Sequence, residues 1–157
     1  LGNVNEGSTT SLSSIGGRFH RAFLALGICV RAFEHSTRVV GLDACHIKTH
    51  FGGVLLVMTI LDGNGQLFPG ALAVAESENA TTWKWFLSLV RTAFDLDDGS
   101  GVVVLSDREK GIDIALSELL PKAAHSFCVY HIMKNVKTRF HTTLNGLLFA
   151  AANAPNV

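Results

Sequence analysis

Two aspartates associated with apolar, β-branched runs are the residues of this chain best placed for chemistry. Asp43 lies within Val39–Lys48, which reads VVGLDACHIK, and Asp107 ends Val102–Asp107, which reads VVVLSD. A carboxylate within a buried strand is costly unless it is paired, hydrogen-bonded or bound to a metal ion. If the two runs form neighbouring strands, the two carboxylates meet, and their oxygens are a candidate site for a divalent ion.

Each aspartate also has a structural interpretation. Asp43 can be satisfied by backbone N–H groups at a strand end, and Asp107 can cap the helix expected over Lys110–Leu120. A capping role at Asp107 is compatible with a functional one. Arg108 and Lys110, next to this aspartate, are candidates for phosphate contacts, and solvated loop charges are the alternative.

A Cys-x-x-His motif at Cys128 and His131 has the spacing of half a zinc site. His125, Cys45 and His46 are further candidate ligands, although no second pair at metal spacing is visible. The alternative is that Cys128 is a small buried residue and that His131 begins a helix. His46 is expected on the opposite face of its strand from Asp43, because side chains alternate along a strand.

Composition points to one globular domain. The chain has 157 residues, of which 48% are hydrophobic, and a mean hydropathy of +0.32, which suffices for a core. The formal net charge is zero, so the basic footprint of a nucleic-acid binder is absent from the whole chain. Between Arg108 and Arg139, however, the sequence has six basic and three acidic residues, which give a local charge of +3.

Cysteine usage and hydropathy indicate a soluble protein of a reducing compartment. Three widely spaced cysteines do not suggest a disulfide framework, and no signal pattern begins the chain. No apolar run reaches the roughly 18 residues of a membrane span.

Hydrophobic periodicity predicts three strands in a meander. Val39–Lys48 and Val54–Leu61 are separated by Gly52-Gly53, and Asp62-Gly63-Asn64-Gly65 is a strong hairpin signal before a third strand over Gln66–Ala75. Pro69 fits this third strand only near an edge or a bulge. An earlier strand and short helix are expected within Arg18–His35, and residues 1–17, rich in Ser, Thr, Gly and Asn, are expected to be a flexible lead-in.

Strand and helix units follow the meander. Trp83, Phe86, Leu87, Val90 and Phe94 share one face of a helix that Ser77 or Asn79 can cap. Trp83 is expected in the core, whereas Trp85 lies off this stripe and could also stack on a base. A doubly buried strand at Val102–Leu105, a helix over Lys110–Leu120, a strand within Ala123–Val129 and a helix from Ile132 through Leu148 complete an α/β mixed sheet in residues 18–157.

An ordered series of motifs resembles the catalytic core of Mutator-like (MULE) transposases. The motifs are Leu42-Asp43-Ala44-Cys45-His46-Ile47-Lys48, Phe51-Gly52-Gly53, Asp62-Gly63-Asn64-Gly65-Gln66-Leu67-Phe68-Pro69, Glu76-Ser77-Glu78-Asn79 before Trp83-Lys84-Trp85-Phe86-Leu87, Ser106-Asp107-Arg108-Glu109-Lys110-Gly111, and Cys128-Val129-Tyr130-His131. The resemblance runs from about Arg18 to Phe149. The order of elements is similar to that of the ribonuclease H-like fold.

The resemblance implies a DDE-type transposase, in which two aspartates and a glutamate hold two divalent ions, Mg²⁺ or Mn²⁺, for DNA cleavage and strand transfer in the nucleus. Asp43 and Asp107 match the first two acids. The third is expected beyond a helical insertion that begins around Cys128–His131, and the chain up to Val157 contains no matching glutamate. We therefore expect a partial catalytic domain that stops within this insertion and does not cleave DNA alone. The alternative is an inactive or domesticated module that binds DNA or proteins.

Overall fold

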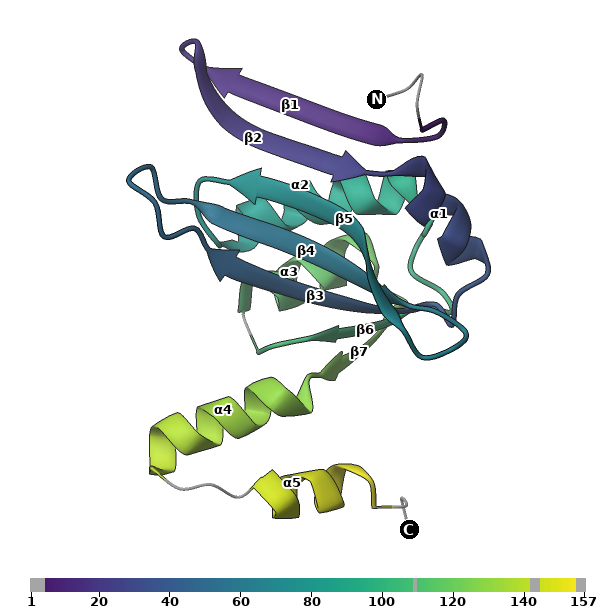
Figure 1. Cartoon of the computed structure of the whole chain (residues 1–157), viewed down its shortest axis with the longest axis vertical. Helices are drawn as coiled ribbons and strands as arrows, with labels where there is room; N and C mark the ends of the chain where they lie inside the picture. The colour runs from purple at the N-terminus through teal and green to yellow at the C-terminus, as the bar shows by residue number, and fades with distance from the viewer. Residues whose placement is uncertain (1–4, 109, 142–144, 155–157) are drawn as a thin grey trace.

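The central strands form where apolar residues alternate. A computed structural model describes residues 5–108, 110–141 and 145–154 (Figure 1). In it β3 (Val39–His46), β4 (Val54–Leu61) and β5 (Leu67–Ala75) pair antiparallel, which confirms the predicted meander. The turn between β4 and β5 is closed by Asp62, whose carboxylate accepts hydrogen bonds from the N–H groups of Asn64 and Gln66, both at 2.8 Å. Pro69 pairs with Thr59 at an irregularity of the register, as its missing N–H requires.

Two parallel strands extend the sheet beyond β3. The described residues form a seven-stranded sheet in the order β1-β2-β5-β4-β3-β6-β7, in which β6 (Val103–Ser106) runs parallel to β3 and β7 (Ala124–Phe127) parallel to β6. Parallel strands require crossovers, and α2 (Ala80–Ala93) and α3 (Lys110–Leu119) supply them. The prediction that β6 is buried on both faces is wrong, because Leu105 is 37% exposed on the face that the helices leave open.

The N-terminal region contains a strand that the sequence analysis did not predict. Within the expected flexible lead-in of residues 1–17, Thr9–Ile15 form β1, which pairs antiparallel with β2 (Arg18–Ala25) at the edge of the sheet. Its side chains are polar or exposed, so backbone pairing alone carries the strand and no apolar period marks it in the sequence. The predicted strand and helix of Arg18–His35 are confirmed as β2 and α1 (Gly27–Glu34).

The core lies between the sheet and the two crossover helices, which lie behind the strands in Figure 1. Trp83 and Phe86 of α2 are fully buried, as is Ala115 of α3, against strand residues such as Leu56 and Ile60. Asn79 caps α2 by accepting a hydrogen bond from Thr82 N–H at 3.0 Å. The core position of Trp83 was predicted, and Asn79 is one of the two caps, with Ser77, that the sequence allowed.

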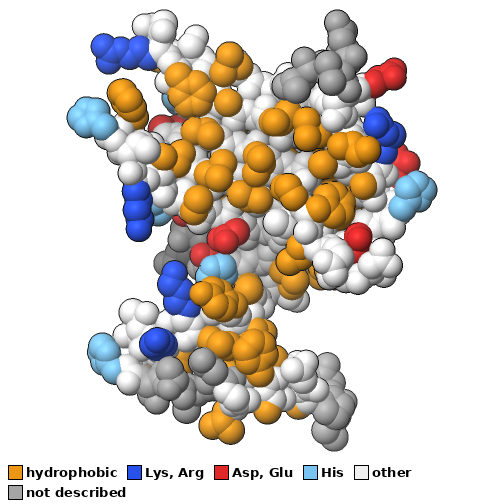
Figure 2. Space-filling model, viewed as in Figure 1, with side chains coloured by type: hydrophobic (Ala, Val, Ile, Leu, Met, Phe, Trp, Pro, Cys, Tyr) orange, Lys and Arg blue, Asp and Glu red, His pale blue; other side chains and the backbone are white. Residues whose placement is uncertain are grey.

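The opposite face of the sheet is not covered by α2 or α3. Figure 2 shows apolar side chains spread across it, and Leu24, Leu55, Leu72 and Val74 on this face are half-buried. Antiparallel sheets commonly bury one face and leave the other accessible. Among the residues that the structure describes, no helix is both long and apolar enough to cross a membrane.

The C-terminal region forms two helices where one was predicted. α4 (Val129–Phe140) ends at His141, which has the left-handed φ of 50°, and α5 (Asn145–Ala152) follows. A residue in the left-handed conformation ends a helix because its backbone does not continue the right-handed turn. Figure 1 shows both helices projecting from the end of β7, and no residue of α4 is buried.

A buried arginine ties β2 to β5 and α2. Arg21 donates from Nε to Glu76 Oε2 at 2.8 Å and from Nη2 to Glu76 Oε1, and it also donates to Thr82 Oγ1 at 3.2 Å. Its guanidinium carbon lies 5.1 Å from the centre of the Trp85 ring, so Arg21 and Trp85 form a cation–π pair within the fold. The Arg21 hydrogen bonds hold the pKa of Glu76 at about 2, below its usual 4.5.

The Glu76 pair predicts a specific acid sensitivity. Because the pKa of Glu76 is lower in the folded chain, the pair stabilises the fold above about pH 4.5 and this contribution is lost as the pH falls towards about 2. We expect Glu76→Gln to lower the urea midpoint at pH 7, and the difference from the parent to shrink below pH 4.5. The control Glu118→Gln removes the exposed pair with Lys84 and should change the midpoint less. A Glu76→Gln deficit that stays constant from pH 7 to pH 2 would contradict this.

Candidate active site

Asp43 lies on the open face of the sheet and not in a buried strand. Its side chain is 63% exposed, whereas its neighbours on the helix-covered face, Val40 and Leu42, are 2% and 3% exposed. The expectation of a buried carboxylate is therefore wrong, because β3 buries only alternate residues. The Asp43 carboxylate accepts a hydrogen bond from Ala44 N–H at 2.9 Å, as the structural interpretation foresaw.

His46 points to the face opposite Asp43, as predicted. It lies across from the buried Val54, whereas Asp43 lies across from the half-buried Val57. Directly opposed residues share a face of an antiparallel pair. His46 and Cys45 are both exposed at the end of β3.

The register of β3 and β6 gives the two aspartates corresponding positions. Val39, Val40 and Gly41 pair with Val103, Val104 and Leu105. Asp43 follows the last of these paired residues of β3 by two positions, and Asp107 follows the last paired residue of β6 by two positions as well. Asp107 is half-buried, directly after β6.

A buried serine anchors the backbone in front of Asp107. Ser106 Oγ donates to the Asp107 carbonyl at 2.6 Å and forms a hydrogen bond with His125 Nε2 at 2.8 Å. The other ring nitrogen of His125 lies 3.4 Å from Asp113 Oδ1 of α3. This chain of contacts was missed in the sequence analysis, which considered His125 only as a metal ligand, and no spacing pattern connects the three residues.

The Cys-x-x-His motif lies against the same strand end. Cys128 N–H donates to the Ser106 carbonyl at 2.7 Å, which places the start of α4 beside Asp107. From the first turn of α4, His131 Nε2 comes within 4.0 Å of Asp43 Oδ1. The other ring nitrogen, Nδ1, is buried and has no hydrogen-bond partner among the residues that the structure describes. Figure 2 shows acidic side chains and a histidine together where the sheet meets α4.

The donor set suits a hard divalent ion held in part by water. The carboxylates of Asp43 on β3 and Asp107 after β6 carry the oxygens that Mg²⁺ and Mn²⁺ prefer, and Mg²⁺ is commonly held by one or two carboxylates and several waters. His131 adds a nitrogen next to Asp43. In the part of the chain that the structure describes, no three His, Cys, Asp or Glu side chains are already arranged around one ion position. The zinc site suggested for Cys128 and His131 stays a prediction.

The two basic candidates, Arg108 and Lys110, follow Asp107 closely in the sequence. Arg108 is exposed directly after Asp107. Lys110 begins α3, and its side chain lies outside what the structure describes.

A family model matches most of this chain. Residues 39–135 match the family model of the MULE transposase domain, a span that includes Asp43, Asp107, Cys128 and His131. The chain belongs to the MULE transposase domain family.

Two curated proteins are similar to this chain. The transposase for insertion sequence element ISRM5 of Rhizobium meliloti is 29% identical over 139 residues, which cover 82% of this chain and 32% of that protein. The PKS-NRPS hybrid synthetase cheA of Chaetomium globosum is 22% identical over 98 residues, 60% of this chain and 2% of that protein. The chain thus spans about a third of the first relative and a small part of the second.

The geometry predicts that metal binding depends on both aspartates. We expect Asp43→Asn and Asp107→Asn each to weaken Mn²⁺ binding at least about tenfold, because each removes one charged oxygen donor from a small ligand set. Isothermal titration with Mn²⁺ measures the change. Asp97→Asn is the control, because Asp97 is exposed in the loop before β6, at the other end of that strand from Asp107. Unchanged Mn²⁺ affinity in Asp43→Asn would remove Asp43 from the metal site.

Proposed function

We propose that this chain is the part of a Mutator-like DNA transposase that supplies the first two acids of a DDE-type site for metal-dependent DNA cleavage and strand transfer. The observation that carries the proposal is that Asp43 and Asp107 each follow by two positions the last paired residue of the parallel strands β3 and β6, inside the span that matches the MULE family. The relative named a transposase supports the same reaction class.

The order of strands supports a ribonuclease H-like arrangement. The antiparallel strands β5, β4 and β3 are followed across the sheet by the parallel β6 and β7, with Asp43 on β3 and Asp107 after β6. In such open sheets ligands bind outside the carboxyl ends of the strands. We assign the DNA substrate to this end of the sheet.

The chemistry follows from the charge of a phosphodiester. Divalent ions bound at this site would neutralise the negative charge that develops on the attacking and leaving oxygens. Asp43 and Asp107 hold the position of that charge, and the Ser106–His125 hydrogen bond fixes the backbone that carries Asp107. His131, 4.0 Å from Asp43, restricts where the Asp43 carboxylate can turn, and is in this proposal a positioning residue. A nuclear location is proposed on the same resemblance, and zinc binding by Cys128 and His131 is proposed on the spacing of their motif.

Arg108 is the proposed phosphate contact of the site. It is exposed next to Asp107, and its guanidinium can bind two phosphate oxygens at once. Lys110 has the same proposed role.

The test is DNA nicking by the full-length protein that carries this chain. We expect Asp43→Asn and Asp107→Asn each to lower Mn²⁺-dependent nicking of a supercoiled plasmid at least about 100-fold, since each weakens a metal site that supplies several kcal/mol of transition-state stabilisation. Asp97→Asn should nick at the parent rate. Full activity in either site variant would refute the proposal.

The 157-residue chain by itself is expected to bind Mn²⁺ without nicking DNA, because it supplies only two of the three expected acids. Nicking by this chain that Asp107→Asn abolishes would show that two acids suffice. DNA binding by the full-length protein without nicking under any metal would favour the alternative, a domesticated binding module.

A further inference from the structure

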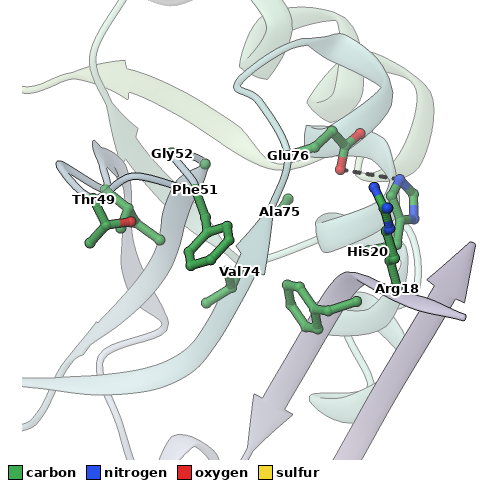
Figure 3. Close-up of a pocket in the computed structure, with 11 residues that line it drawn as sticks. Arg18, His20, Thr49, Phe51, Gly52, Val74, Ala75 and Glu76 are labelled. Atoms are coloured by element: carbon green, nitrogen blue, oxygen red, sulfur yellow. Dashed lines mark ion pairs between the residues drawn. The ribbon is translucent and has the colours of Figure 1, made fainter.

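A second cavity lies at the same end of the sheet as Asp43. It has a volume of about 920 Å³ and is bounded by the start of β2, the loop after β3 and the end of β5. Figure 3 shows Phe51 directed towards Val74, with Arg18 and His20 beside Glu76 on the other side of the cavity. The volume falls within the range of sites for small organic ligands. Nothing in the proposed DDE chemistry uses these residues.

Two exposed phenylalanines line this cavity. Phe51 is 94% exposed and Phe19 is 58% exposed. A single exposed aromatic ring needs no explanation, but two at one cavity with an apolar wall mark a binding surface.

Two glycines shape the loop after Phe51. Gly52 and Gly53 have left-handed φ angles of 63° and 99°, and a Cβ on Gly53 would lie 2.8 Å from the Ala75 carbonyl oxygen. Glycine permits both the turn and this approach to β5. The Phe51-Gly52-Gly53 motif therefore brings the loop against β5, with Phe51 in the cavity lining.

The charge around the cavity favours an anion. Arg18 lines the cavity and is exposed, and among the described residues it is in no ion pair. Glu76 is the one acidic residue in the lining, and its carboxylate is already bound by Arg21 and lies 3.5 Å from His20. A ligand with flat rings and negative charge, such as a nucleotide, matches both properties.

The cavity is within reach of DNA held at Asp43. Ile47, which lines it, follows Asp43 by four residues on the same extended segment, a separation of about 13 Å. This length corresponds to about four nucleotides of a stacked strand.

We propose that this cavity binds unpaired nucleotides of a single DNA strand, with Phe19 and Phe51 stacking on bases and Arg18 and His20 contacting phosphates. This inference rests on the proposed function, since it extends the path of the same DNA. Stacking on aromatic rings accepts any base and needs bases that are free of a partner strand. The site thus distinguishes single-stranded from duplex DNA.

Fluorescence anisotropy with a short labelled oligonucleotide, single-stranded or annealed to its complement, tests the site on the full chain. We expect Phe51→Ala to weaken single-strand binding about tenfold and duplex binding much less. Because Phe51 is almost fully exposed, its removal should leave folding intact, which circular dichroism checks. Phe19→Ala should act in the same direction. The matched control is Leu67→Ala, an apolar residue 69% exposed at the opposite end of β5.

Equal binding by Phe51→Ala, Leu67→Ala and the parent would overturn the proposal, and so would an equal loss for single strand and duplex. Asp43→Asn separates this result from the proposed function. We expect it to abolish nicking by the full-length protein and to keep single-strand affinity. If Asp43→Asn still nicks while Phe51→Ala loses single-strand binding, the metal proposal fails and the cavity proposal stands.

Discussion

The parallel pairing of β3 with β6 is the interaction on which the rest of the structure depends. Side chains alternate along β3, so a slip of one residue would turn Asp43 to the other face. The register is held by Val40, Leu42 and Val104, which must face α2 and α3 to be buried. Apolar burial on one face therefore decides that Asp43 lies on the open face.

The site is assembled from segments far apart in the chain and attached to this pair. The Ser106 carbonyl accepts a hydrogen bond from Cys128 N–H, and the Ser106 hydroxyl bonds to His125 of β7. These contacts start α4 at the end of the sheet, from where His131 reaches Asp43. The Cys-x-x-His motif thus lies near both strands, since Cys128 bonds to the end of β6 and His131 lies 4.0 Å from Asp43 of β3.

The candidate sites occur at one end of the sheet for a topological reason. The strands β3, β5, β6 and β7 run in the same direction, so their carboxyl ends lie at one end of the sheet, and β2, antiparallel to β5, begins there. Asp43, Asp107 and the cavity beside Phe51 therefore lie towards this end. The remaining surface of the open face is apolar and carries no charged site of this kind in the described residues (Figure 2).

The sequence by itself determined the meander and the α2 helix, because turns and apolar periods are local signals, and it determined the family through an ordered series of motifs. Tertiary structure alone decided the rest. β1 forms through backbone pairing, which its polar sequence does not indicate. Asp43 is exposed because the helices cover only one face of β3. His131 lies near Asp43 because α4 follows β7 at that end of the sheet. Each of these depends on contacts between residues distant in the chain, which no local period records.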